Sequence, residues 1–303
     1  MPNNARWTIR LSDVPSNMAV HQYILHVTDL KDQMTKFSKF NLQNYGREKI
    51  NFNLGKLKES IKEGVELYGL HKFIYGNQGS ENSPYVSASL TWNPNAYDKI
   101  SNDPHMATLG STELKWNSAS LYEEVNDSTL FRNSYHDTFA FVERTPFSNH
   151  KDVKIFLDTF KRTLIRSRIS TVKANREEAT KFDFCWHNDE QIFLNLRINI
   201  PIQTSSNYVI QIINKADNNQ NKDLEIDEFC MEDGYAYVYD TSQTHRPFCK
   251  KLDSKDRIHM ICGVSPWFDY DKLNQCWNSN EYYGQIHPFE MFRMGLISPA
   301  FVK

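Results

Sequence analysis

Three side chains in this sequence have the types and spacing of metal ligands. His187 and Asp189 are two positions apart, and His245 follows much later in the chain. Residues i and i+2 of a strand point to the same side, so His187 and Asp189 can bind one ion together. Two histidines and one carboxylate on one face of an ion, with the remaining positions open, are typical of non-haem Fe(II) centres. We therefore expect His187, Asp189 and His245 to be metal ligands and catalytic residues.

Two arginines are suited to hold the carboxylate of a dicarboxylic co-substrate. Arg257 begins the apolar run that follows His245, and His259 would face the same side of that strand. Arg197 alternates with Asn199 on one face of an expected strand, and such inward polar groups need a polar partner. A guanidinium group presents a rigid fork that matches a carboxylate. We expect Arg257, assisted by Arg197 and Asn199, to bind this anion.

Short apolar runs separated by turn residues predict the β-rich fold that would position these groups. Short strands at such spacing favour a β-sandwich or barrel. Amphipathic helices are expected at Leu54–Leu70 and Asp152–Arg168, and a strand at Thr138–Val142, while Ala19–Val27 fits a strand or a short helix. The expected strands of the barrel are Phe182–Trp186, Ile192–Ile202, Tyr208–Ile213, Leu224–Phe229, Tyr235–Tyr239 and Ile258–Val264.

The pattern of apolar, polar and turn residues divides the chain into three regions. Residues 1–130 are expected to support the barrel and to shape the substrate site. Residues 131–267 are expected to form the catalytic core. Residues 268–303 are rich in aromatic side chains, and we expect them to pack on the barrel or on a second subunit, the latter giving a homodimer.

Composition narrows the classes of partner and the compartment. The net charge of -2 offers no electrostatic basis for binding nucleic acid or an anionic membrane. No apolar run approaches the roughly 20 residues of a spanning helix, and no signal peptide is recognisable. The 5 cysteines are odd in number and include no CxxC pair, which favours reduced thiols and a cytoplasmic location.

Five segments between Ile165 and Pro266 carry a family resemblance. They are Arg168-Ile169-Ser170, His187-Asn188-Asp189, Leu196–Pro201, Met231–His245 and Arg257–Ile261. In order and approximate spacing they resemble the aspartyl/asparaginyl β-hydroxylase family, which includes bacterial cis-proline hydroxylases. The resemblance implies a mainly β fold with flanking helices, a double-stranded β-helix (cupin-type jelly-roll barrel). It also implies Fe(II), 2-oxoglutarate and O2 as cofactor and co-substrates.

The resemblance assigns roles residue by residue. It implies that His245 binds metal and that Arg257, Arg197 and Ser170 contact 2-oxoglutarate. Asp189 is kept, as in the proline-hydroxylase-like branch. The expectation is a dioxygenase that hydroxylates a C–H bond of an amino acid, free or carrier-tethered and proline-like, with release of succinate and CO2.

Three alternatives remain open at this point. The substrate could be an Asp, Asn or Pro residue within a peptide or protein. A non-catalytic cupin could bind a metal or anion without turnover. A hydrolase could hold Zn(II) in the same site, although no general base for it stands out.

Overall fold

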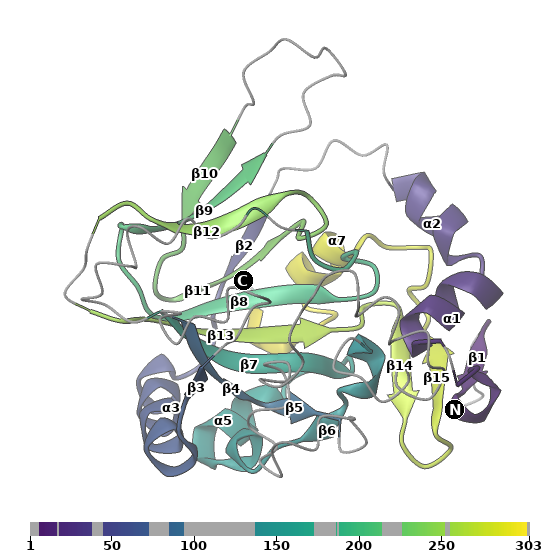
Figure 1. The fold of residues 1–303 in the computed structure, drawn as a ribbon, viewed down its shortest axis with the longest axis horizontal. Helices are drawn as coiled ribbons and strands as arrows, with labels where there is room; N and C mark the ends of the chain where they lie inside the picture. Colours follow the sequence, from purple (N-terminus) through teal and green to yellow (C-terminus); the bar gives the residue numbers. More distant parts are fainter. Residues whose placement is uncertain are drawn as a thin grey trace, which may run out of the picture.

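Two antiparallel sheets face each other in this chain, and the described residues of the predicted site lie on or beside their strands. The computed structural model describes residues 6–16, 18–37, 45–72, 85–93, 137–172, 186, 188–213, 226–251 and 255–301. Figure 1 shows the smaller sheet lying over the larger one, with helices beside and beneath them.

The larger sheet has 7 strands in the order β2-β11-β8-β13-β7-β4-β3. One face of its central strands is aliphatic, with Ile198, Ile200 and Met260 in the hydrophobic core. The opposite face carries polar residues that look toward the smaller sheet. The strands are β2 Tyr45–Lys49, β11 Tyr235–Tyr239, β8 Leu196–Gln203, β13 Arg257–Val264, β7 Leu164–Val172, β4 Tyr85–Ser89 and β3 His71–Lys72.

The smaller sheet contains β10 Ile226–Cys230, β9 Tyr208–Ile213 and β12 His245–Cys249, in that order. Along the chain β8 is followed by β9 and β10 in the smaller sheet, β11 returns to the larger sheet, β12 to the smaller one and β13 to the larger one. The first strand of this series, β7, pairs with the last, β13. This winding is a double-stranded β-helix, so the predicted mainly β fold is confirmed.

Helices and short strands flank the barrel. α3 and α5 supply Leu57, Ile61, Val153 and Phe156 to the core that backs the larger sheet. The 3-stranded sheet β1-β15-β14 lies at the opposite side of the molecule, near α1 and α2 (Figure 1). The remaining elements are β1 Thr8–Arg10, η1 Leu11–Asp13, α1 Val20–Val27, α2 Leu30–Phe37, α3 Leu54–Tyr68, β5 Thr91–Trp92, η4 Thr138–Ala140, β6 Glu143–Arg144, η5 Phe147–Asn149, α5 Lys151–Leu157, β14 Phe268–Asp271, β15 Cys276–Ser279, α7 Pro288–Arg293 and η6 Pro299–Phe301.

Two predicted elements are wrong in the described chain. The expected helix Asp152–Arg168 ends at Leu157, and β7 begins at Leu164. The Thr159 hydroxyl donates to the Phe156 carbonyl at 2.7 Å, which ends the helix with a local turn, and the following residues alternate in burial like a strand. The expected strand Thr138–Val142 begins as the 3-10 helix η4.

Other predicted elements agree with the structure. Helix α3 and strands β9 and β11 lie within the predicted bounds, and Ala19–Val27 is resolved as a helix, α1. The strand expected at Ile192–Ile202 begins only at Leu196, because Phe193 turns into an aromatic cluster with Trp267 at 4.9 Å between ring centroids. Of the expected strand Phe182–Trp186, all but Trp186 lie outside the described residues.

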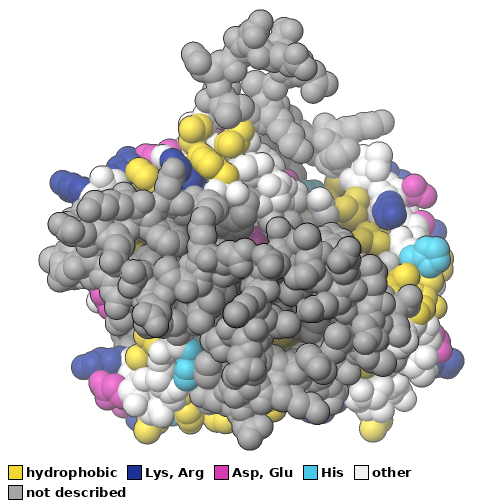
Figure 2. Space-filling model, in the orientation of Figure 1, with side chains coloured by type: hydrophobic (Ala, Val, Ile, Leu, Met, Phe, Trp, Pro, Cys, Tyr) yellow, Lys and Arg dark blue, Asp and Glu magenta, His cyan; other side chains and the backbone are white. Residues whose placement is uncertain are grey.

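The C-terminal segment packs on the same core as the barrel. Phe289, Phe292 and Phe301 are all buried within it. The division into three regions and the homodimer stay predictions. In the described part of the chain, no helix is long and apolar enough to cross a membrane. Among the described cysteines, Cys230, Cys262 and Cys276 are free thiols. Figure 2 shows side chains of both charge signs interspersed around the visible described surface.

Candidate active site

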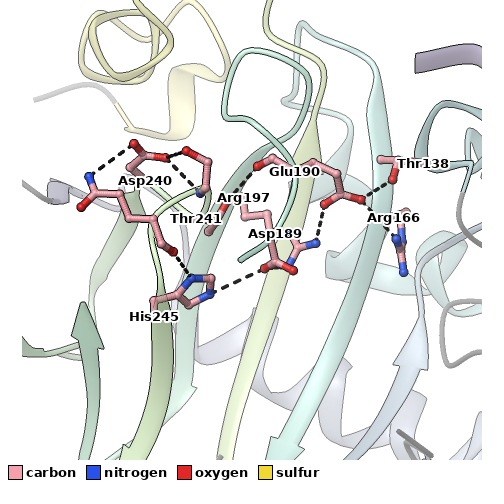
Figure 3. A network of polar contacts seen from close by, with 10 residues as sticks. Thr138, Arg166, Asp189, Glu190, Arg197, Asp240, Thr241 and His245 are labelled. Carbon is pink, nitrogen blue, oxygen red and sulfur yellow. Dashed lines mark hydrogen bonds and ion pairs between the residues drawn. The ribbon is translucent and has the colours of Figure 1, made fainter. Parts of the chain in front are cut away.

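Two of the three predicted metal ligands meet at one end of the barrel. His245 opens β12, and its Nε2 lies 3.6 Å from Asp189 Oδ2 (Figure 3). His245 is 1% exposed, so its ring is held by packing. His187 lies outside the described residues. Within the described part of the chain, no three His, Cys, Asp or Glu side chains form a group able to hold a metal.

The backbone fastens the two ligand-bearing segments to each other. The Asp189 N–H donates to the Thr241 carbonyl at 2.8 Å, and the Thr241 hydroxyl donates to the Glu190 carbonyl at 3.4 Å. The Asn188 amide donates to the Ser242 carbonyl at 2.7 Å. These bonds join the turn before His245 to the residues around Asp189, so the two side chains approach one point, His245 from β12 and Asp189 from the segment 188–190.

A hydrogen bond to the backbone fixes which nitrogen of His245 is available. His245 Nδ1 lies 2.9 Å from the Gln243 carbonyl oxygen, which can only accept, so Nδ1 carries the proton. In the neutral ring Nε2 then holds a lone pair, and Nε2 is the atom that faces Asp189. Metal-binding histidines commonly donate their other ring N–H to a carbonyl in this way. The observed tautomer therefore suits metal binding through Nε2.

Arg197 joins Asp189 to a second carboxylate that sequence reasoning did not single out. Arg197 Nη1 donates to Asp189 Oδ2, and its Nη2 donates to Glu190 Oε2 at 2.7 Å. Arg166 Nη1 and the Thr138 hydroxyl donate to the other oxygen, Glu190 Oε1, at 3.2 and 2.5 Å. Burial alone would raise the pKa of Glu190, but Arg197, Arg166 and Thr138 together hold it below its ordinary value.

The set Thr138, Arg166, Asp189, Glu190, Arg197 and His245 is called the carboxylate cluster below. Figure 3 shows these side chains converging from β7, β8, β12 and η4 and from the segment 188–190, which carries Asp189 and Glu190. The Asp-Glu pair with an arginine downstream is a local signal that could have indicated part of it. Its Thr138 and Arg166 members lie in segments whose predicted structure was wrong.

A β-bulge directs Arg166 toward Glu190. The pairing of β13 with β7 shifts register between Ile261 and Gly263, and Arg166 has a φ of 43°. A non-glycine residue in this left-handed region is uncommon and costs about 1 kcal/mol or more. Gly263 fits opposite because a Cβ there would lie 2.2 Å from the Ile165 carbonyl oxygen. Bulges of this kind re-aim side chains beside active sites.

A second group of polar side chains crosses the inner face of the larger sheet. Ser87, Ser170 and His259 are direct neighbours on β4, β7 and β13, and residues opposite each other on adjacent strands share a face. Arg257 lies two residues before His259 and shares that face. This set of Ser87, Ser170, Arg257 and His259 is called the polar row. All of its members are buried.

The polar row contains donors that the described part of the chain leaves unsatisfied. Arg257 Nη2 lies 2.9 Å from His259 Nδ1, and because arginine only donates, Nδ1 accepts and the neutral ring carries its proton on Nε2. Burial, then the Arg257 charge, lowers the pKa of His259 well below its ordinary value, which keeps the ring neutral. Among the described residues, His259 Nε2 and Ser87 Oγ find no hydrogen-bond partner although both are buried. Such orphaned donors beside an arginine fit an anionic ligand.

Tyr239 lies between the two groups. Its ring packs edge-on against His245 at 5.3 Å between centroids. Burial and the negative charge of Asp189 raise the pKa of Tyr239 to about 12, against the lowering effects of Arg197 and Arg257. Charges from the carboxylate cluster and from the polar row thus act on one phenol, which stays protonated at neutral pH. The remaining predicted site residue is Asn199. It is buried in β8, where it pairs with Tyr237 of β11.

The residues fit the predicted metal and co-substrate as far as the described chain reaches. Asp189 offers a carboxylate oxygen and His245 an imidazole nitrogen, donors that a non-haem iron site uses. The polar row offers an arginine and an unpaired N–H donor to a carboxylate. The contacts of Arg197 are with protein carboxylates, and its role toward a co-substrate stays a prediction.

Comparisons with known proteins find only remote similarities. No family model matches the chain, and no curated protein matches it either. Among solved structures it is similar to the non-haem α-ketoglutarate-dependent epimerase SnoN from nogalamycin biosynthesis, with 9% identity, 78% of this chain and 83% of that chain covered, and a TM-score of 0.40. It is also similar to a prolyl-4-hydroxylase of Pseudomonas putida, with 5% identity, coverages of 78% and 99%, and a TM-score of 0.36.

A third similar structure is an oxidoreductase of the 2OG-Fe(II) oxygenase family from Burkholderia pseudomallei, with 8% identity, coverages of 79% and 91%, and a TM-score of 0.37. At these identities and TM-scores the likenesses leave the activity to be inferred from the side chains of this chain itself.

Proposed function

We propose that this chain is an Fe(II)- and 2-oxoglutarate-dependent dioxygenase. The observation that carries the proposal is the approach of His245 Nε2 to Asp189 Oδ2, 3.6 Å apart, from segments distant in sequence. The polar row on the inner face of the same barrel supports it, because its arginine and orphaned donor suit a carboxylate. A dicarboxylate held there could reach toward a metal at the mouth of the barrel.

Each residue then has a stated task. Asp189 and His245, together with His187, would hold the metal. Arg257, His259 and Ser170 would hold the far carboxylate of 2-oxoglutarate, and Asn199 would contribute a polar contact from β8. When bound, iron and 2-oxoglutarate supply, with O2, the oxidising power that replaces a C–H hydrogen by hydroxyl and leaves succinate and CO2. Buried aromatic and aliphatic neighbours such as Tyr239 keep water from the site.

The proposed substrate is an amino acid, free or carrier-tethered and proline-like. The support is the resemblance to the aspartyl/asparaginyl β-hydroxylase family, whose proline-hydroxylase-like branch also keeps the middle carboxylate, here Asp189. An Asp, Asn or Pro residue in a peptide is the alternative substrate. A non-catalytic metal-binding cupin would bind the same ions without turnover.

One experiment separates these functions. Anaerobically purified protein is loaded with Fe(II), and succinate formation from 2-oxoglutarate is followed with a panel of free amino acids and short peptides. Mass spectrometry detects a product that has gained one oxygen. We expect succinate from the wild type and none from Asp189→Ala, whereas the surface variant Asp158→Ala should behave like the wild type.

Absence of succinate with every panel member, together with equal Fe(II) binding by wild type and Asp189→Ala, would rule out the dioxygenase. Binding of Fe(II) that depends on Asp189 without any turnover would support the non-catalytic module instead.

A further inference from the structure

Arg197 is committed to two carboxylates of the protein itself. Its fork donates to Asp189 through Nη1 and to Glu190 through Nη2. The Arg197 and Asp189 side chains are 12% and 14% exposed, so the pair is largely shielded from water. In such surroundings a charge-assisted contact fixes the position of both partners. The geometry therefore ties the rotamer of the predicted metal-binding carboxylate to Arg197.

Glu190 is in turn held on its other side. The Thr138 hydroxyl and Arg166 Nη1 both donate to Oε1, leaving Oε2 to face Arg197. The Thr241 hydroxyl also donates to the Glu190 carbonyl, which fixes the backbone at this residue. Glu190 is thus anchored from η4, from β7 and from the turn before His245. It acts as a fixed point against which Arg197 is aligned.

The contact between Arg166 and Glu190 requires a strained backbone conformation. Arg166 reaches Glu190 from a bulge in β7 with a φ of 43°, opposite a glycine that no larger residue could replace without displacing Ile165. Strain that persists beside a site is often part of how the site is organised. Charge balance points the same way, because two arginines face the two carboxylates of Asp189 and Glu190.

We propose that Glu190 is a positioning residue for the metal site: it holds Arg197, and through Arg197 it orients the Asp189 carboxylate toward His245. Arg197 then serves the metal-binding carboxylate, and the polar row binds the far carboxylate of the co-substrate without Arg197. This inference rests on the proposed function in that it takes Asp189 and His245 as metal ligands.

The test uses Co(II), whose visible absorption reports the ligands of an Fe(II) site. Co(II) affinity and the Co(II) spectrum are measured for wild type, Glu190→Gln and Thr138→Val, with thermal stability recorded for each. Glu190→Gln keeps the size of the side chain and removes its charge. We expect its Co(II) affinity to fall about tenfold, as when an outer partner of a ligand is lost, with a shifted spectrum. Thr138→Val, a smaller perturbation, should give a shift in the same direction.

Glu63→Gln is the matched control, because Glu63 pairs with Lys151 at 2.6 Å and with His150 at 3.1 Å away from the site. It should leave the Co(II) affinity and spectrum unchanged. In the Co(II)-loaded protein, 2-oxoglutarate affinity corrected for metal occupancy should be the same for Glu190→Gln and wild type. A gain in 2-oxoglutarate affinity would mean that Arg197, once released, binds the co-substrate, and would overturn the inference.

The failures of the two proposals are distinguishable. If wild type binds no Co(II), or binds it equally after Asp189→Ala, the metal site itself is refuted. If binding depends on Asp189 while folded Glu190→Gln and Thr138→Val both match wild type in affinity and spectrum, the positioning role is refuted and the metal site stands.

Discussion

The carboxylate cluster and the polar row occupy the same barrel but are built in opposite ways. In the carboxylate cluster, both oxygens of Glu190 and one oxygen of Asp189 accept from named donors. In the polar row, the described residues provide no partner for His259 Nε2 or Ser87 Oγ, although both residues are buried. A buried polar group without a partner lowers the free energy of unfolding by about 1–3 kcal/mol, so the polar row destabilises the ligand-free protein.

This difference separates two tasks. Groups that satisfy one another fix a geometry before any ligand arrives, which suits the orientation of a metal-binding carboxylate. Groups left unsatisfied gain most when a ligand arrives, which suits the binding of an anion. Variants in the two regions should therefore differ in whether they affect the free protein or the ligand-bound protein.

The largest effect is expected from His245→Ala. It removes an imidazole ligand and should lower Fe(II) affinity by more than about 100-fold, since loss of a mere outer partner already costs up to that much. Isothermal titration under anaerobic conditions measures it, with His150→Ala as the control. Unchanged affinity in the folded variant would show that the carboxylate cluster is not a metal site.

Arg257→Gln should act on the co-substrate and spare the metal. We expect the KM for 2-oxoglutarate to rise about 10- to 100-fold, because hydrogen bonds to charged groups contribute about 1.5–3 kcal/mol. Fe(II) affinity should stay within about twofold of wild type, as distant sites are usually independent. Steady-state succinate formation measures the first and titration the second. An equal loss of 2-oxoglutarate affinity and Fe(II) affinity would show that the carboxylate cluster and the polar row do not have separate tasks.

Thr138→Val and Ser87→Ala form a matched pair for stability. Thr138→Val removes a donor to the Glu190 carboxylate and should lower the free energy of unfolding by about 1.5 kcal/mol. Ser87→Ala removes a buried hydroxyl for which the described residues offer no partner, so it should raise the free energy of unfolding by about 1 kcal/mol. Urea denaturation of the ligand-free protein measures both. A loss of stability in Ser87→Ala would mean that the Ser87 hydroxyl has a partner in the folded protein.

The last expected effect is a pH dependence of stability. The pKa of His259 is lowered in the folded protein, so between that value and its ordinary pKa of about 6.5 the unfolded chain binds the extra proton. Stability then falls as pH drops below about 6.5, by at most about 1.4 kcal/mol per pH unit for this group. Burial also lowers the pKa of His287, to about 4, so it adds to the same slope.

His259→Asn keeps an acceptor for Arg257 and removes the titrating ring. The slope of unfolding free energy against pH between 5 and 6.5 should flatten in this variant and in His287→Asn. A slope equal to wild type in His259→Asn would show that the pKa of His259 is not lowered in the folded protein, which would contradict a neutral ring held by the polar row.

Sequence patterns predicted the barrel where apolar alternation and turn residues coincide. Strands β9 and β11 were predicted with their observed bounds because each is short, β-branched or aromatic, and flanked by turn residues. The helix predicted over Asp152–Arg168 failed because its apolar spacing continues by coincidence into β7, which is a strand through pairing with β4 and β13. That pairing involves residues far away in the chain, so no local pattern contains it.

The candidate site shows the same division. Asp189, His245 and Arg257 could be predicted because their side-chain types alone indicate metal or anion binding. Ser87 joins Ser170 only through strand pairing across 83 positions, and the left-handed conformation of Arg166 has no signature in a non-glycine residue. These contributions depend on register and on a bulge, which single-sequence reasoning does not reach.

The pairing of β7 with β13 also bears on how the protein is made. The first strand of the barrel finds its partners in β13 and in β4, so it cannot complete the sheet during synthesis until Val264 has left the ribosome. Contacts between residues so far apart in sequence make folding slow. The segments around Asp189 and His245 join only after β11 and β12 exist, so we expect the proposed metal site to form late, once translation has passed the barrel.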